Sequence, residues 1–265
     1  MILKPNVNNP KLTKRIEGLD HEMKKTSLDV VVEQPLTLFL NSQEIVTMMT
    51  INDYPEFLAV GYLLNQNMIS KADKIISIDY DSELNVVVVR TNKKSNFEKK
   101  LKKKILTSGC AQGTVFGDIM ESFEKKKLSD NQRLKVKWIY ELSKSITLTP
   151  SLYLKAGAIH GCVLCEKKAP LIYMEDVGRH NAIDKIAGYM FLNKIEPNNK
   201  IFYTTGRLTS EMVIKSVIMQ IPIVISRSGF TVWGVELARK ANLTLIGRAK
   251  GKKFTILSGE NRIEE

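Results

Sequence analysis

Cys110 offers the clearest chemistry in this sequence of 265 residues. It lies in the segment TSGCAQGT (107–114), where Gly109, Gly113 and small polar neighbours indicate a flexible, exposed loop. A lysine-rich run precedes the loop at residues 99–104. Nearby cations lower the pKa of a thiol from its usual value of about 8.5 and favour the nucleophilic thiolate. The segment therefore permits a reactive or sulfur-carrying cysteine, although an ordinary surface cysteine is also compatible with it.

The other two cysteines, Cys162 and Cys165, form a Cys-x-x-Cys pair that invites a zinc or redox interpretation. Their segment, residues 158–165, alternates like a β-strand, so positions three apart point to opposite faces. One metal ion could not easily take both thiols, and adding His160 would still leave a zinc site without a fourth ligand. We therefore predict that both cysteines are core residues and that the chain has no metal site.

A second concentration of functional groups is the segment EDVGRHNAIDK, residues 175–185. It follows an apolar run and precedes a helical pattern, so it predicts a strand-to-helix junction. Ligands of open α/β sheets bind at the carboxyl ends of strands, where N–H groups at helix N-termini hold anions. Arg179 and His180 are therefore candidate binding or orienting residues. The plainer alternative is a helix cap at Asp176 or Asn181 with Arg179 in a surface ion pair.

Basic residues recur where three later predicted strands end. Arg207 follows the first of these strands, Ser226 and Arg227 follow the second, and Arg248 follows the third. If the strands are parallel, their turns share one edge of the sheet, where hydroxyls, glycines and arginines form an anion pocket. Short turns favour Gly and Ser in any protein. The repeated arginine is not part of that preference, and it favours a phosphorylated ligand.

The elements that position these residues divide the chain into three segments. Residues 1–27 are polar and predict a flexible arm. Residues 28–148 predict a smaller α+β domain that carries the mobile Cys110 loop. Two hairpins are expected, over residues 28–51 and 75–90. A helix over residues 52–69 has Asp53 as N-cap and Pro55 in its first turn. A second helix, over residues 129–146, begins at Ser129-Asp130.

Residues 149–265 form the third segment, after a boundary at Thr149-Pro150. Strands and helices alternate from residue 171 to 246. This alternation predicts an α/β domain with a largely parallel or mixed sheet and helices on both faces.

Composition limits the classes of function. The net charge is +12, which calls for an anionic partner or serves solubility. Nucleic acid is unlikely, because the aromatic strands of single-strand binders and zinc-finger spacings are missing from the sequence. No apolar run approaches the roughly 20 residues that cross a bilayer, and the first 15 residues lack the pattern of a secretory signal. We expect a cytoplasmic protein, and three unevenly placed cysteines fit a reducing compartment.

Together, these motifs resemble the FdhD family, the formate dehydrogenase accessory sulfurtransferases. The resemblance covers residues 28–263 and rests on Gly157-Ala158-Ile159-His160, on the 175–185 segment, on Gly206-Arg207 with residues 210–213, and on residues 243–247. It implies a homodimer that takes persulfide sulfur from a cysteine desulfurase of the IscS type. The sulfur would pass to the molybdenum cofactor, a bis(molybdopterin guanine dinucleotide), before insertion into formate dehydrogenase. It also implies a cytidine-deaminase-like fold for the C-terminal half.

The resemblance implies roles for individual residues. The persulfide cysteine of the family falls on Cys110. The cofactor-binding stretch of the family falls on Arg248, Ala249, Lys250, Gly251, Lys252 and Lys253. The other candidate residues of the pocket, whose arginines suit the phosphates of a guanine dinucleotide, are Arg179, His180, Arg207, Ser226 and Arg227. GDP-like nucleotides would mimic the bound cofactor.

Two departures from the family pattern matter. The family usually has a second cysteine in the mobile loop, where this chain has Gly113. A single-cysteine persulfide carrier is then the first hypothesis, and a non-catalytic chaperone of the molybdenum cofactor is the alternative. The chain also lacks the His-x-Glu and Pro-Cys-x-x-Cys motifs of zinc deaminases, so we expect no zinc chemistry despite the deaminase-like fold.

Overall fold

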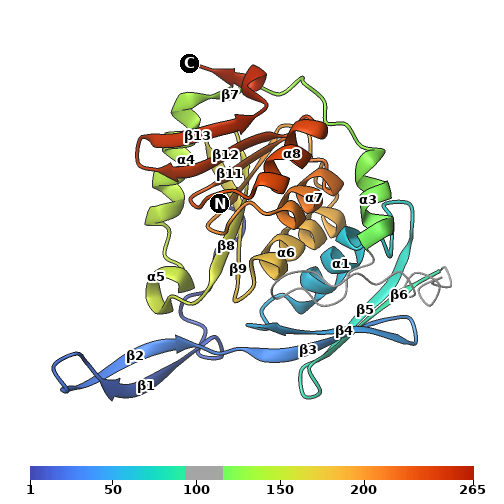
Figure 1. The fold of residues 1–265 in the computed structure, drawn as a ribbon. Helices are drawn as coiled ribbons and strands as arrows, with labels where there is room; N and C mark the ends of the chain where they lie inside the picture. Colours follow the sequence, from blue (N-terminus) through green and yellow to red (C-terminus); the bar gives the residue numbers. More distant parts are fainter. Residues whose placement is uncertain (93–115) are drawn as a thin grey trace.

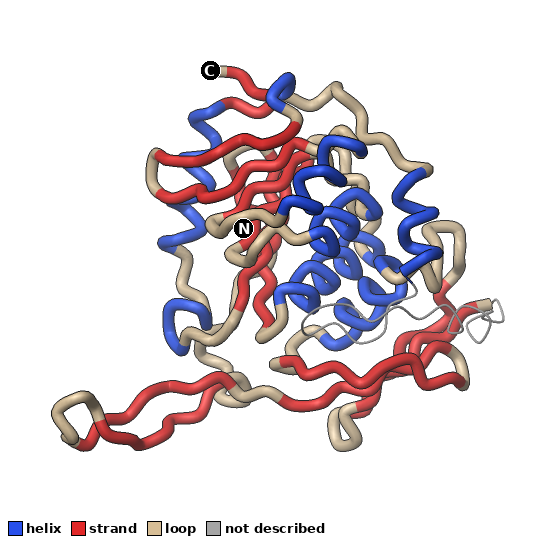
Figure 2. Tube along the Cα trace, in the orientation of Figure 1, coloured by secondary structure: helices blue, strands red, loops and turns tan. Residues whose placement is uncertain are grey.

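The structure is a computed structural model that describes residues 1–92 and 116–265, except for the side chains of residues 116–118. Its centre is a six-stranded sheet (Figures 1 and 2). The strands are β8 (His160–Glu166), β9 (Ala169–Asp176), β10 (Lys200–Thr204), β11 (Ile223–Ser226), β12 (Thr244–Lys250) and β13 (Lys253–Ser258), in the spatial order β13-β12-β11-β10-β8-β9. Strands β10, β11 and β12 are parallel, and the other pairs are antiparallel. The predicted α/β class is therefore confirmed.

Helices cover both faces of this sheet, but the helices between residues 171 and 246 all lie on one face, and a helix from the segment before residue 149 covers the other, which the alternating pattern does not predict. One face packs against α3 (Phe116–Glu124), α6 (Arg179–Leu192), α7 (Ser210–Ile218) and α8 (Val232–Lys240), and the other packs against α4 (Val136–Leu148). Successive side chains of each strand alternate between the two cores, because Cβ atoms along a strand point to opposite faces. The helices and the sheet together form the core that positions the carboxyl ends of the strands.

A second, four-stranded sheet lies below the first in the view of Figure 1. It contains β3 (Gln34–Leu40), β4 (Gln43–Thr50), β5 (Ile75–Asp81) and β6 (Val86–Thr91), in the order β4-β3-β6-β5, and packs against α1 (Pro55–Asn65). Both predicted hairpins are present. Helix α1 starts after Tyr54, which has a left-handed backbone (φ 51°), with Pro55 in its first turn. The predicted N-cap, Asp53, is wrong because that side chain contacts Lys185 instead.

Helix α1 and helix α6 cross in direct backbone contact. A Cβ atom built on Gly61 of α1 would lie 1.7 Å from the carbonyl oxygen of Asp184. One built on Gly188 of α6 would lie 1.9 Å from the carbonyl oxygen of Phe57. Only glycine fits at either position. This pair of residues therefore allows α1, with the four-stranded sheet, to pack directly against α6 of the central core.

The N-terminal segment contains a hairpin rather than the expected loose arm. Strands β1 (Thr13–Leu19) and β2 (Lys25–Val31) pair antiparallel and project from the body of the molecule (Figures 1 and 2). Their apolar residues Ile16 and Leu28 face each other across the hairpin but stay 45% and 65% exposed. In β1 every side chain after the first is exposed, so the strand has no buried apolar face. The expected boundary at residues 27/28 falls inside β2.

The segment around residue 130 also differs from expectation. The predicted helix over 129–146 begins at Val136 and ends at Leu148. Asp130 does not cap it; its carboxylate accepts hydrogen bonds from Asn242 and Asn261 and pairs with buried Arg262. The remaining short elements are β7 (Leu134–Lys135), which pairs with β14 (Ile263–Glu264), the 3-10 helix η1 (Glu260–Arg262) and α5 (Leu152–Ala156).

The domain boundary expected at residues 148/149 stays a prediction, but packing groups the chain differently. Ile139, Leu142 and Ile146 of α4 share an apolar cluster with strands of the central sheet, and Ile119 and Phe123 of α3 share another. Residues 116–148 therefore pack with the C-terminal core. No helix in the described part of the chain is long and apolar enough to cross a membrane.

Candidate functional site

The carboxyl ends of β9, β10, β11 and β12 lie along one edge of the central sheet, because β8 runs antiparallel to both β9 and β10. Backbone hydrogen bonds hold the turns after β10, β11 and β12 side by side. The N–H of Arg227 donates to the carbonyl oxygen of Thr204 (3.1 Å), and that of Arg248 donates to Ser228 (2.8 Å). The predicted convergence of the basic turns on one edge is therefore present, and we call these turns the basic edge.

Two arginines and a histidine meet at the basic edge. The side chain of Arg179 lies against Gly206, where an added Cβ would be 3.0 Å from its Cδ atom. Burial, together with the nearby charges of Arg179 and Arg207, lowers the pKa of His160. His160 is therefore neutral at neutral pH, and the positive charge here belongs to the arginines. Guanidinium groups in such a cluster suit phosphate oxygens, which they can contact in a bidentate manner.

Arg227 and Ser226 have different roles at this edge. The guanidinium of Arg227 lies 6.0 Å from the ring centroid of Tyr153, which packs beside it. The hydroxyl of Ser226 is buried, donates to the carbonyl oxygen of Gly206 (2.6 Å) and accepts from the N–H of Ser228 (2.9 Å). Ser226 therefore shapes the turns, and Arg227 remains a candidate contact for a ligand.

The stretch 248–253 forms the end of β12 and its turn into β13. Ala249 is buried in the apolar cluster on the α4 side of the sheet, so its side chain is a core group. Gly251 has a positive φ (58°), which the tight turn requires. The basic side chains are exposed and extend the positive charge of the edge outward, at Arg248, Lys250, Lys252 and Lys253.

The 175–185 segment is largely buried and acts first as a joint between the two sheets. Lys185 is fully buried, and its ammonium contacts Asp53, the Oδ2 atom of Asp176 (2.6 Å) and the carbonyl oxygen of Glu175 (2.9 Å). Thr50, at the end of β4, donates to Asp176 at 2.5 Å. Because Thr50 and Asp53 belong to the N-terminal part, this cluster connects it to the central core.

Glu175 holds the start of helix α5. Its carboxylate accepts the backbone N–H groups of Leu152 (2.8 Å) and Tyr153 (3.0 Å), which a helix N-terminus leaves unpaired. Burial raises the pKa of Glu175 to about 7, and the two hydrogen bonds oppose that shift. Glu175 thus positions the α5 segment that carries Tyr153 to the basic edge.

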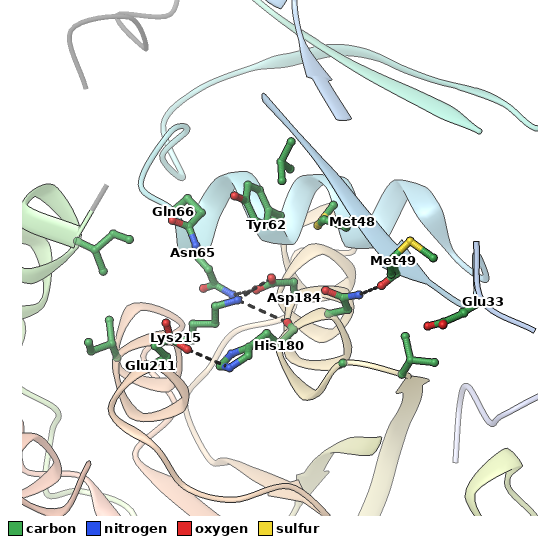
Figure 3. Close-up of a pocket in the computed structure, with 16 residues that line it drawn as sticks. Glu33, Met48, Met49, Tyr62, Asn65, Gln66, His180, Asp184, Glu211 and Lys215 are labelled. Atoms are coloured by element: carbon green, nitrogen blue, oxygen red, sulfur yellow. Dashed lines mark hydrogen bonds and ion pairs between the residues drawn. The ribbon is translucent and has the colours of Figure 1, made fainter. Parts of the chain in front are cut away.

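His180 contacts helix α7. Its Nε2 atom lies 3.0 Å from Oε2 of Glu211 (Figure 3). Burial lowers the pKa of His180, so at neutral pH it is a neutral donor to Glu211. Lys215, one turn further along α7, pairs with buried Asp184 at 2.7 Å. Arg179 lies against Gly206 and His180 contacts Glu211, so the two neighbouring side chains have different partners.

Asp184 is also the acceptor for Asn65 of α1, at 2.7 Å. A cavity of about 420 Å³ lies beside this cluster, between β4, α1 and the start of α6 and α7 (Figure 3). Its lining includes His180, Glu211 and Lys215 but none of the arginines of the basic edge. The polar groups at the ends of the strands and those that line this cavity are therefore different residues, although the charge of Arg179 acts on His180 and Glu211.

The cysteines sort as the strand pattern predicts. Cys162 faces the α6–α7 side of the sheet and Cys165 faces the α4 side, and both are fully buried. Burial raises the pKa of Cys162 to about 12 and raises that of Cys165 as well. Both groups therefore stay thiols at neutral pH and belong to the core. Cys110 lies outside the described residues.

The sequence matches the FdhD/NarQ family over residues 31–264. The chain belongs to the FdhD/NarQ family. Among curated proteins it is 31% identical over 238 residues to a protein of Wolinella succinogenes named sulfur carrier protein FdhD, covering 89% of this chain and 83% of the relative. A Bacillus pumilus protein of the same name is 30% identical, with 89% and 91% covered.

A solved structure agrees with the FdhD/NarQ assignment. It is a crystal structure of a candidate formate dehydrogenase accessory protein from Desulfotalea psychrophila, with a TM-score of 0.77 and 26% identity. The match covers 95% of this chain and 98% of the other. The FdhD/NarQ match begins inside β2, so most of the projecting hairpin lies outside it.

Several residues of these sites could not be assigned from the sequence. Glu211 and Lys215 are four residues apart and so share one face of α7, which was an available signal of a charged helix face. Thr50, Asp53 and Asn65 carried no signal of their own, because their partners lie more than a hundred residues later in the FdhD/NarQ chain.

Proposed function

We propose that this chain carries sulfur on Cys110. The observation that carries the proposal is the burial of Cys162 and Cys165, which leaves Cys110 as the remaining cysteine of the sequence for thiolate chemistry. The Cys110 thiolate attacks the outer sulfur of a donor persulfide, a new S–S bond forms, and the donor cysteine leaves as a thiolate. The donor is a cysteine desulfurase of the IscS type.

The acceptor in this proposal is the molybdenum cofactor, a bis(molybdopterin guanine dinucleotide), before its insertion into formate dehydrogenase. Family membership supports this assignment, as do the relatives named sulfur carrier protein FdhD and the structural relative described as a formate dehydrogenase accessory protein. The protein would act as a cytoplasmic homodimer.

The basic edge is the proposed site for the phosphates of this cofactor. Arg207, Arg227 and Arg248 come from three turns that backbone hydrogen bonds hold together, and the side chain of Arg179 lies against Gly206 in the first of these turns, so these charges are placed before a ligand arrives. Arginine forks pair with phosphate oxygens through charge-assisted hydrogen bonds. GDP is the simplest probe, because it presents a guanine and a diphosphate.

Mass spectrometry tests sulfur carriage directly. The protein is incubated with a cysteine desulfurase and cysteine, and the mass of the intact chain is measured. We expect a gain of one sulfur in the wild type and in Cys162→Ala, and none in Cys110→Ala. A sulfur gain that persists in Cys110→Ala, or no gain in the wild type, contradicts the assignment.

The alternative function is a chaperone that binds the molybdenum cofactor without handling sulfur. Gly113 favours it, because this chain lacks the second loop cysteine usual in the family. The same measurement separates the two functions. A protein that binds GDP at the basic edge but never gains sulfur on Cys110 is a chaperone.

A further inference from the structure

The cavity beside α1 and α7 has a polar end and an otherwise largely apolar lining. Its volume is about 420 Å³, within the size range of small-molecule sites. The polar end includes Asn65, Gln66 and Glu211 (Figure 3). The apolar residues of the lining include Val46, Met48, Tyr62, Ile119 and Ile214. Such a combination suits a ligand with one polar head and an apolar body.

The polar end carries acceptor atoms that the described residues do not satisfy. They are Oδ1 of Asn65, Oε1 of Gln66 and Oε1 of Glu211. Asn65 and Gln66 are only 1% and 4% exposed, and a buried acceptor without a donor costs free energy. The assignment of Oδ1 in Asn65 is firm, because its amide nitrogen faces Asp184, a carboxylate that only accepts at 2.7 Å.

Glu211 is an acceptor for the same reason. Its Oε2 atom already faces Nε2 of His180 at 3.0 Å. Burial alone would raise the pKa of Glu211, but the hydrogen bond from His180 outweighs this effect and lowers it. Glu211 is therefore ionised at neutral pH. The second carboxylate oxygen can therefore only accept. A ligand that fits here has to supply N–H or O–H donors.

The charge around the cavity selects among donors. Glu33 at its exposed mouth, Asp184 and Glu211 contribute three carboxylates, and Lys215 contributes one ammonium. His180 is neutral, because burial lowers its pKa. The lining of the cavity is thus negative within a chain of net charge +12, although the charge of Arg179, outside the lining, also acts on Glu211. Over a few ångströms the near carboxylates outweigh distant lysines, which salt screens beyond roughly 8–10 Å.

We propose that this cavity binds a small organic cation: a primary amine whose ammonium faces Glu211, Asn65 and Gln66 and whose apolar body lies on Met48, Tyr62 and Ile214. An ammonium has three donors and no acceptor, which complements the unpaired oxygens of the polar end. Anionic ligands such as nucleotides are excluded by the same carboxylates. The site shares no lining residue with the arginines of the basic edge, and the proposal does not depend on sulfur transfer.

Calorimetric titration with three matched probes tests the proposal: 2-phenylethylamine, 2-phenylethanol and 3-phenylpropanoate. Losing a charge-assisted hydrogen bond costs about tenfold or more in affinity. We expect the amine to bind at least about tenfold more tightly than the alcohol, and the carboxylate not to bind. Equal affinity of amine and alcohol, tighter binding of the carboxylate, or no binding of the amine at about 10 mM overturns the proposal.

Two variants locate the binding site. Glu211→Gln removes the charge and keeps the shape, and Gln66→Met removes an acceptor whose side-chain oxygen has no partner in the described structure. Each is expected to weaken amine binding by about tenfold. Glu236→Gln, on the exposed surface of α8, is the matched control and should bind as the wild type does. Unchanged binding in both cavity variants places the amine elsewhere and refutes the site. Sulfur loading of Cys110 is a separate readout, so failure here leaves the proposed function unaffected.

Discussion

Replacing Lys185 by methionine should destabilise the protein strongly. The ammonium of Lys185 is fully buried and contacts Asp176, Asp53 and the carbonyl oxygen of Glu175. Burial alone would lower the pKa of Lys185, but the carboxylates of Asp176 and Asp53 outweigh this effect and raise it. The ammonium therefore stays charged. Methionine fills similar volume but leaves both carboxylates buried without their cation. Removing one partner of a buried ion pair costs about 3–5 kcal/mol.

Urea denaturation and calorimetry measure this cost. At about 2–4 °C per kcal/mol for a chain of this size, the melting temperature of Lys185→Met should fall by about 10 °C. The matched control is Lys137→Met, because Lys137 lies on the surface of α4 with its side chain 82% exposed. The control should change stability by less than about 0.5 kcal/mol. Adding Asp53→Asn to Lys185→Met should recover about 1–2 kcal/mol of the free energy of unfolding, because it removes one of the two carboxylates left without a cation.

A loss of less than about 1 kcal/mol in Lys185→Met would refute this reasoning. It would mean that water reaches Asp176 and Asp53 or that both become protonated at little cost. A double variant no more stable than the single variant would show that Asp53 carries no charge in the cluster.

Three further predictions concern a carboxylate, a glycine and an arginine. Because burial raises the folded-state pKa of Glu175 from 4.5 to about 7, the unfolded state releases its proton first, and stability should fall by up to about 3 kcal/mol between pH 4.5 and 7. Glu175→Gln should remove that fall in urea titrations at several pH values. Gly61→Ala places a methyl group 1.7 Å from a backbone oxygen and should cost about 3 kcal/mol or more in the free energy of unfolding. Arg207→Gln should weaken GDP binding about tenfold in calorimetry.

Two of these changes, Gly61→Ala and Arg207→Gln, have matched control variants. Gly18→Ala adds a methyl group where nothing lies within 4 Å, so it should be close to neutral. Lys137→Gln removes a surface charge far from the basic edge and should leave GDP binding unchanged. An identical pH profile in Glu175→Gln and wild type would show that Glu175 titrates normally. Wild-type stability of Gly61→Ala would show that α1 can move away from α6 without cost.

Much of the fold could be predicted from local patterns in the sequence. The alternation around Cys162 and Cys165 placed the two thiols on opposite faces, and the structure agrees. The repeated strand and helix segments after residue 171 predicted the parallel strand ends that meet at Arg207 and Arg227. Both inferences depend on the spacing of near neighbours in the chain, which a single sequence displays.

Pairings between distant residues were not accessible in this way. Asp53 and Ser129-Asp130 are suitable helix caps by residue type, but Asp53 contacts Lys185 and Asp130 contacts Arg262. The orientation of His180 toward Glu211 depends on how α6 packs on α7. Backbone pairing between β1 and β2 holds the hairpin together, and its apolar side chains are exposed. The sequence therefore shows no apolar face that would indicate this hairpin.

The polar joint between the two sheets has a consequence for synthesis on the ribosome. Thr50, Asp53 and Asn65 find their partners 126, 132 and 119 residues later in the chain. These groups and Gly61 lack their native partners until α6 has left the exit tunnel. Contacts between residues so far apart in the chain form slowly. A nascent chain stopped before residue 185 should thus be a substrate for chaperones and proteases, whereas one extended through α7 can close the joint. The segment from Glu175 to Lys185 therefore sets the point in translation at which the N-terminal half becomes committed to its native structure.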